Sequence, residues 1–139
     1  MSCSRKNNTF LNRSWHATTA QYNTLYNGTL ALEQGKKALS ENYLENFWEV
    51  FPVEPMEQQE FAGVNNQEEG YFSTAEAKAV KAIQKHAMMI DGWERNPQID
   101  EAYMLLGKAR YYDQRFVGAL EAFNFILQRY PLSNSINTA

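Results

Sequence analysis

The chain has 139 residues, of which 44% are hydrophobic and 14% aromatic, and its formal net charge is −3 at pH 7. This length suffices for one compact domain with a sizeable core, and the apolar content exceeds that of disordered chains. The acidic balance gives no broad attraction to nucleic acid or anionic lipid, and no apolar run approaches the roughly 18 residues that cross a bilayer. We therefore expect a water-soluble body with no nucleic-acid role.

The N-terminal segment, residues 1–13, is polar and irregular and holds the only cysteine, Cys3. A single cysteine forms no internal disulfide, so the thiol is either incidental or a site of modification. The polar tether after Cys3 leads directly into a predicted helix, as expected if a lipid on Cys3 holds the fold at a membrane surface. No apolar signal segment precedes Cys3, and these residues alone leave both interpretations open.

A helical pattern begins near Ser14, where apolar residues recur on one face at spacings of three, four and seven. Gly35 is expected to end this helix, and a second helix runs from Lys36 to about Val50 before Pro52 stops it. The two helices, residues 14–51, are similar to a diverged helix-pair repeat whose second helix is two residues out of register. The residues of the first face are Trp15, Tyr22, Leu25, Tyr26 and Leu30.

Residues 52–72 change in character to Pro, Gln, Asn and Gly, with five acidic residues and no Lys or Arg. This composition predicts a long, acidic polar loop. Ser73 and Glu76 then match a capping box, Ser-x-x-Glu, which predicts a helix from Ser73 to Ile90.

A short connection is expected after this helix. Gly92 occupies the position of a C-terminal helix cap. Asn96 and Pro97 then predict the start of the next helix, with Asn96 as its N-cap and proline at its first position.

Residues 100–133 match one tetratricopeptide repeat, a unit of about 34 residues that folds as two antiparallel helices. Small residues at its eighth and twentieth positions, Gly107 and Ala119, let the helices approach each other, and Pro131 closes the unit. The window predicts an all-α, tetratricopeptide-like helical-hairpin solenoid, in which residues 134–139 begin a further repeat. The residues expected to fill the space between the helices are Tyr103, Leu106, Phe116, Leu120 and Phe123.

Two positions of the window depart from the repeat pattern. Arg110 occupies the eleventh position, which is usually aromatic, and Ile126 occupies the twenty-seventh, which is usually alanine. These departures predict altered packing against the neighbouring unit. The alternative to a repeat is an ordinary amphipathic helix hairpin.

Stacked helix pairs of this kind form a curved surface whose concave side is lined by their first helices. In the 100–133 window this side mixes charged side chains with large amphipathic rings, a composition typical of protein interfaces. We predict that it binds a protein partner and that Tyr112→Ala leaves the fold intact while weakening that binding. The predicted partner-binding residues are Glu101, Met104, Lys108, Tyr111 and Tyr112.

The sequence contains few residues in patterns that support catalysis. His16 and His86 are isolated along the chain, and no His, Cys, Asp or Glu cluster has the spacing of metal ligands. There is no glycine loop that would hold a phosphate and no local signature of a nucleophilic triad. We expect a non-enzymatic protein with no cofactor, no metal site and no small-molecule substrate.

A closer resemblance is carried by five segments, residues 3–6, 22–28, 46–55, 78–86 and 96–103. In these segments the chain resembles the N-terminal region of the SprE/PorW family of tetratricopeptide lipoproteins of Bacteroidota. The resemblance implies that Cys3 corresponds to the acylated cysteine, which anchors the protein to the periplasmic side of the outer membrane. It also implies a scaffold that links the outer-membrane translocon to the periplasmic parts of the type IX secretion and gliding-motility machinery.

Two other functions remain open at this point. A BamD-like outer-membrane assembly lipoprotein would share the lipidated cysteine and an Arg-Tyr-Pro ending of a repeat, found here at residues 129–131. A soluble tetratricopeptide adaptor would instead bind a peptide in its concave groove, with Cys3 incidental. Such an adaptor is expected to carry a basic clamp for a carboxylate, whereas the predicted groove offers only Lys108, with Arg110 to its side.

Overall fold

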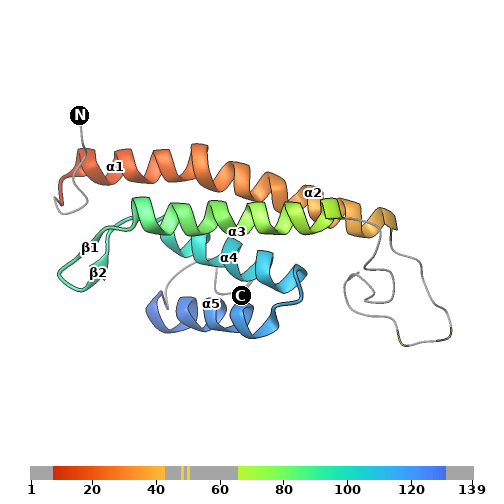
Figure 1. The fold of residues 1–139 in the computed structure, drawn as a ribbon. Helices are drawn as coiled ribbons and strands as arrows, with labels where there is room; N and C mark the ends of the chain where they lie inside the picture. The colour runs from red at the N-terminus through yellow and green to blue at the C-terminus, as the bar shows by residue number, and fades with distance from the viewer. Residues whose placement is uncertain (1–7, 43–47, 49, 51–65, 131–139) are drawn as a thin grey trace.

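The computed structural model describes residues 8–42, 48, 50 and 66–130. These residues form an all-α fold of helical hairpins with one short β-hairpin, which confirms the predicted fold class. Figure 1 shows a long N-terminal helical rod at the top, helix α3 beside it, and helices α4 and α5 stacked below.

The N-terminal rod consists of α1 (Phe10–Thr19), the π-helical segment η1 (Ala20–Leu25) and α2 (Tyr26–Asn42), which follow one another without a break. The rod begins earlier than the predicted Ser14, because Thr9 caps it. The Thr9 side chain accepts a hydrogen bond from the backbone N–H of Asn12 at 3.3 Å. This contact satisfies one of the amide groups that the first turn of a helix leaves free.

The predicted helix break at Gly35 is wrong. Gly35 lies buried within α2, and a Cβ atom at this position would come within 2.7 Å of the Phe72 ring on α3. Glycine costs about 1 kcal/mol in a helix interior, but here the missing side chain lets the two helices approach closely. The described part of residues 14–51 is consequently one helix, and the predicted helix pair is also wrong.

The buried face of the rod is built from small or polar residues, and the face predicted from large residues is mostly exposed. Leu25 lies in the core, as expected. The other residues of the predicted face are exposed: Trp15, Tyr22, Tyr26 and Leu30. Periodicity identified a continuous face, but the partner helix packs on the opposite, smaller side chains.

The π-helical segment keeps this buried face aligned. Residues His16, Ala20, Thr24 and Gly28 are all buried and are spaced by four residues. In an α-helix of 3.6 residues per turn, each step of four drifts by about 40° around the axis. The wider π-helical turn absorbs part of this drift, so all four residues face the body of the protein.

Helix α3 (Asn66–His86) runs back along the rod and buries Phe72, Ala75, Ala79 and Ala82. The predicted capping box is wrong, because Ser73 and Glu76 lie inside this helix. Residues 66–72 of the predicted loop are helical, since the helix must extend beyond Phe72 to bury its ring against α2. The rest of that predicted loop lies outside the described residues.

A β-hairpin follows α3 where the sequence predicted a longer helix with a glycine cap. Strands β1 (Met89–Ile90) and β2 (Trp93–Glu94) pair antiparallel, with Ile90 opposite Trp93. Asp91 and Gly92 form the turn with positive φ angles of 54° and 79°. Two positive φ angles define the type I′ hairpin turn, for which Asp-Gly is a preferred pair. The prediction of a helix through Ile90 is therefore wrong.

Helices α4 (Ile99–Tyr112) and α5 (Phe116–Arg129) confirm the hairpin predicted in the 100–133 window. Helix α4 begins slightly later than predicted, because Asn96 lies fully buried in the connection. Its side-chain amide donates to the carbonyl oxygen of His86 at 2.9 Å, and its side-chain oxygen accepts from the amide of Gln98 at 3.0 Å. Asn96 thus joins the end of α3 to the start of α4.

Gly107 sets the distance between α4 and α5, as the repeat pattern predicted. A Cβ atom at Gly107 would lie 2.4 Å from Cε1 of Phe123, and Ala119 is also buried. The prediction is wrong for Leu120, which is 60% exposed on the outer side of α5. Pro131 and the predicted further repeat at residues 134–139 lie outside the described residues.

Candidate interaction surfaces

Met104 and Tyr112, two residues of the predicted concave binding face, lie in the core, with only 7% and 8% of their surfaces exposed. The Tyr112 ring stacks on Phe72 of α3 with ring centroids 5.6 Å apart. The Lys36 ammonium of α2 lies 5.4 Å from the centre of the same ring. The prediction that these two residues contact a partner is wrong, because α2 and α3 already cover them.

The other predicted residues of this face are more accessible. Glu101 is exposed, whereas Lys108 and Tyr111 are half-buried. The Tyr111 ring packs edge-on against Tyr112 and against Phe116, with centroid distances of 5.4 and 5.7 Å. This face therefore contributes mainly to packing between helices, and only its rim reaches solvent.

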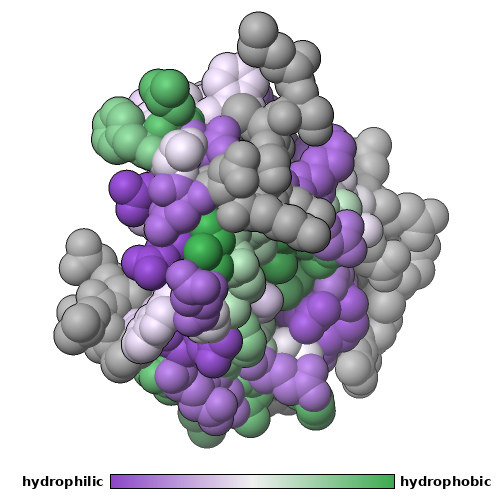
Figure 2. Space-filling view, turned by 90° about the vertical axis from the view of Figure 1, so that its left-hand side faces the viewer, coloured by the Kyte–Doolittle hydropathy of each residue, from purple (hydrophilic) through white to green (hydrophobic). Residues whose placement is uncertain are grey.

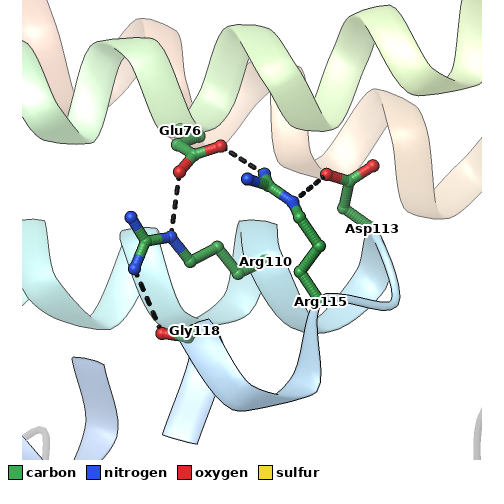
Figure 3. Close-up of polar contacts among 5 residues, drawn as sticks. All are labelled: Glu76, Arg110, Asp113, Arg115 and Gly118. Carbon is green, nitrogen blue, oxygen red and sulfur yellow. Dashed lines mark hydrogen bonds and ion pairs between the residues drawn. The ribbon is translucent and has the colours of Figure 1, made fainter. Parts of the chain in front are cut away.

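A network of charged side chains links α3, α4 and α5 (Figure 3). The Nε of Arg110 donates to Oε1 of Glu76 at 2.9 Å, and its Nη1 donates to the carbonyl oxygen of Gly118 at 3.2 Å. Arg115 donates to the other carboxylate oxygen of Glu76 and, through Nε, to Asp113 at 2.6 Å. Arg110 fills the position where the repeat pattern has an aromatic residue, so a polar cross-link replaces an apolar contact there.

The environment of Glu76 favours its charged form. Burial raises the pKa of this carboxyl, but the hydrogen bonds and positive charges of Arg115 and Arg110 outweigh burial and bring the pKa below its usual value. A carboxylate with two guanidinium partners makes charge-assisted bonds that are stronger than neutral ones. We conclude that the network stabilises the arrangement of the three helices at neutral pH.

We expect Glu76→Gln to lower the free energy of unfolding at pH 7 by about 1–2 kcal/mol, because both arginines lose their charged partner in a part-buried site. The folded-state pKa of Glu76 is depressed, so its contribution is present above the unfolded-state pKa and is lost as pH falls through the folded-state pKa. The difference between wild type and variant should therefore shrink on acidification below about pH 4. Urea denaturation between pH 3 and pH 7 measures this difference.

Glu41→Gln is the matched control for this experiment. Glu41 pairs with Lys37 at 3.7 Å on the surface of α2, where both side chains are largely exposed. Exposed pairs contribute less than about 1 kcal/mol. If Glu76→Gln were no more destabilising than Glu41→Gln, the network would not be a structural link between the helices.

The two histidines, which are isolated in the sequence, meet in the fold. Their Nδ1 atoms are 3.2 Å apart, between α1 and the end of α3, and both rings are buried. One ring therefore donates to the other, while Nε2 of His16 has no hydrogen-bond partner. Sequence separation hid this pair, since 70 residues lie between its members. Within the described residues, no group of three or more His, Cys, Asp or Glu side chains is arranged to hold a metal ion.

Helix α5 exposes an apolar surface on the side away from α4. Val117, Leu120 and Leu127 are 76%, 60% and 46% exposed, and they are spaced by three and seven residues along one side of the helix. Such spacing is typical of a helix face that packs against another helix. We call these three residues the α5 surface.

A second exposed surface lies on the N-terminal rod, on the opposite side of the stack. It consists of Leu11, Trp15, Tyr22 and Tyr26, and we call it the outer rod surface. Figure 2, which faces the end of the molecule where α1 begins, shows hydrophobic side chains on the surface at the height of α1. The sequence pattern detected most of this line but assigned it to the core.

The remaining comparisons and predictions bear on identity. No protein-family model and no curated protein matches the chain. Among the described helices, none combines the length and the apolar character needed to cross a bilayer. Cys3 lies outside the described residues, so its lipidation stays a prediction.

Proposed function

We propose that this protein is a non-enzymatic interaction scaffold of tetratricopeptide type, held on the periplasmic side of the outer membrane by a lipid on Cys3. In this role it links the outer-membrane translocon and periplasmic components of type IX secretion and gliding motility. The observation that carries the scaffold proposal is the α5 surface, an exposed apolar helix face with no partner among the described residues. Contiguous exposed apolar surface of this kind marks protein interaction sites.

The structural support for the scaffold is the pair of helices α4 and α5 in the 100–133 window, with Gly107 against Phe123 at its closest approach. Units of this type bury their faces against neighbouring helices. A helical segment of a partner therefore fits the α5 surface by the same apolar packing. The proposed secretion and motility role rests on the sequence resemblance described above.

The membrane anchor is tested by intact mass spectrometry of the native full-length protein, purified from membrane and soluble fractions of its own cell. We expect a diacyl or triacyl group on the cysteine that corresponds to Cys3, in the membrane fraction. An unmodified cysteine in a soluble cytoplasmic fraction would remove the lipoprotein proposal and leave a helical adaptor.

The scaffold role is tested with the Leu127→Glu variant and purified components of the secretion machinery. A carboxylate in the α5 surface must be desolvated on binding, so we expect capture of the partner to fall at least about tenfold. Leu30→Glu is the control, because Leu30 and Leu127 are both 46% exposed but lie on opposite sides of the stack. Equal capture by both variants would mean that the α5 surface is not the partner site.

The same binding assay distinguishes the assembly-lipoprotein alternative. Purified barrel-assembly components are offered to the wild-type protein beside the secretion components. We expect retention of the secretion components only. Retention of the barrel-assembly components alone would contradict the proposed role.

A further inference from the structure

The outer rod surface forms a straight line of side chains along one helix. Leu11, Trp15, Tyr22 and Tyr26 are 77%, 60%, 66% and 62% exposed, and they are spaced by four, seven and four residues. These spacings keep the four side chains on one side of the rod. The opposite side of the rod packs on α3, so the line faces away from the body of the protein (Figure 1).

The charge of the chain is unevenly distributed, and its basic part coincides with this line. Residues 1–32 contain Arg5, Lys6 and Arg13 but no Asp or Glu, and the first acidic residue is Glu33. This part carries a formal charge of +3, and because the whole chain carries −3, the rest carries −6. The exposed aromatic side chains are thus grouped with the positive charge of an otherwise acidic protein.

This combination of side chains fits the boundary between lipid and water. Trp and Tyr have an apolar body and a polar tip, and they are enriched where acyl chains meet headgroups. Basic residues near an anionic leaflet each add about 1 kcal/mol of attraction. A straight helix presents its side chains along a line, so a flat surface contacts all four at once. A helix with these properties lies in the plane of the interface.

We infer that the outer rod surface binds an anionic lipid surface, with the rod parallel to the bilayer and its aromatic rings at headgroup depth. This inference deepens the membrane part of the proposed function and rests on it. It orients the protein, because the α5 surface on the opposite side of the stack then faces away from the bilayer and stays accessible to proteins.

The test uses the full chain without its acyl group and vesicles of phosphatidylcholine, with or without phosphatidylglycerol. We expect flotation with the anionic vesicles, at least about tenfold weaker partition to the neutral ones, and weaker binding at high salt. The Trp15→Ser/Tyr22→Ser variant should lose at least about tenfold in partition. The control is Met89→Ser/Trp93→Ser, because these hairpin side chains are 51% and 69% exposed but lie outside the basic segment.

A fluorescence measurement gives the depth of the contact directly. The chain has three tryptophans, so Trp48→Phe/Trp93→Phe leaves Trp15 as the single reporter. We expect brominated lipids in the anionic vesicles to quench its emission. Quenching equal to that by a brominated lipid in vesicles that do not bind would contradict the contact.

Two results would overturn the inference. One is unchanged flotation of the Trp15→Ser/Tyr22→Ser variant, or an equal loss in the hairpin control. The other is no flotation of the wild-type chain, together with reduced capture of secretion proteins by the variant, which would assign the surface to a protein partner. Absence of an acyl group, or unchanged capture by Leu127→Glu, would contradict the proposed function without changing the vesicle result.

Discussion

Tyr112→Ala should lower the free energy of unfolding by about 3–4 kcal/mol, as expected for the loss of a large aromatic ring from a core. The ring is 8% exposed and stacks on Phe72, and Lys36 lies above it. Its removal leaves a cavity where α2, α3 and α4 meet. Thermal and urea unfolding followed by circular dichroism measure the effect.

The matched control is Tyr26→Ala, the same substitution at a side chain that is 62% exposed. A surface substitution of this kind changes stability by less than about 0.5 kcal/mol. If Tyr112→Ala were as mild as Tyr26→Ala and weakened partner binding instead, Tyr112 would belong to an accessible binding face, as first predicted from the sequence.

Gly107→Ala should lower the free energy of unfolding by about 2–3 kcal/mol. Three ring atoms of Phe123 lie within 2.8 Å of the position that the new Cβ would occupy. The substitution therefore forces α5 or the ring to move, and overpacking of this kind costs about 1–3 kcal/mol even though alanine is the better helix former. The midpoint of urea denaturation measures this loss.

Gly70→Ala is the control for Gly107→Ala. Gly70 is exposed on α3, and no atom lies within 4 Å of its Cβ position. Alanine there should raise the free energy of unfolding by up to about 1 kcal/mol, because it reduces the entropy of the unfolded chain. Opposite signs at the two glycines would establish close packing at Gly107, whereas equal signs would contradict it.

The sequence predicted best where packing is local. The pair α4 and α5 lies within one window of the chain, and the small residues Gly107 and Ala119 mark the positions where its helices touch. Neighbouring elements of this kind are encoded by spacing alone. The all-α class followed from the same periodicity.

The rest depended on which distant element covers each face. Trp15 and Tyr22 are large, yet they face outward, because α3 packs on the side of the rod where Gly28 and Gly35 permit close approach. Hydrophobic spacing identifies a face but does not specify its partner. The His16 and His86 contact was missed for the same reason. The hairpin turn, in contrast, had the local signal Asp91-Gly92, which was assigned to a helix cap.

The π-helical segment Ala20–Leu25 couples the two ends of the rod through chain length. Removal of one residue there would restore α-helical winding and rotate everything before it by about 100° relative to α2. His16 would turn away from His86, and Trp15 would leave the line of Tyr22 and Tyr26. A single-residue deletion would therefore disturb an internal contact and an external surface together. Length changes in homologous chains should accordingly avoid residues 20–25, and a gap placed there in an alignment would indicate a different surface.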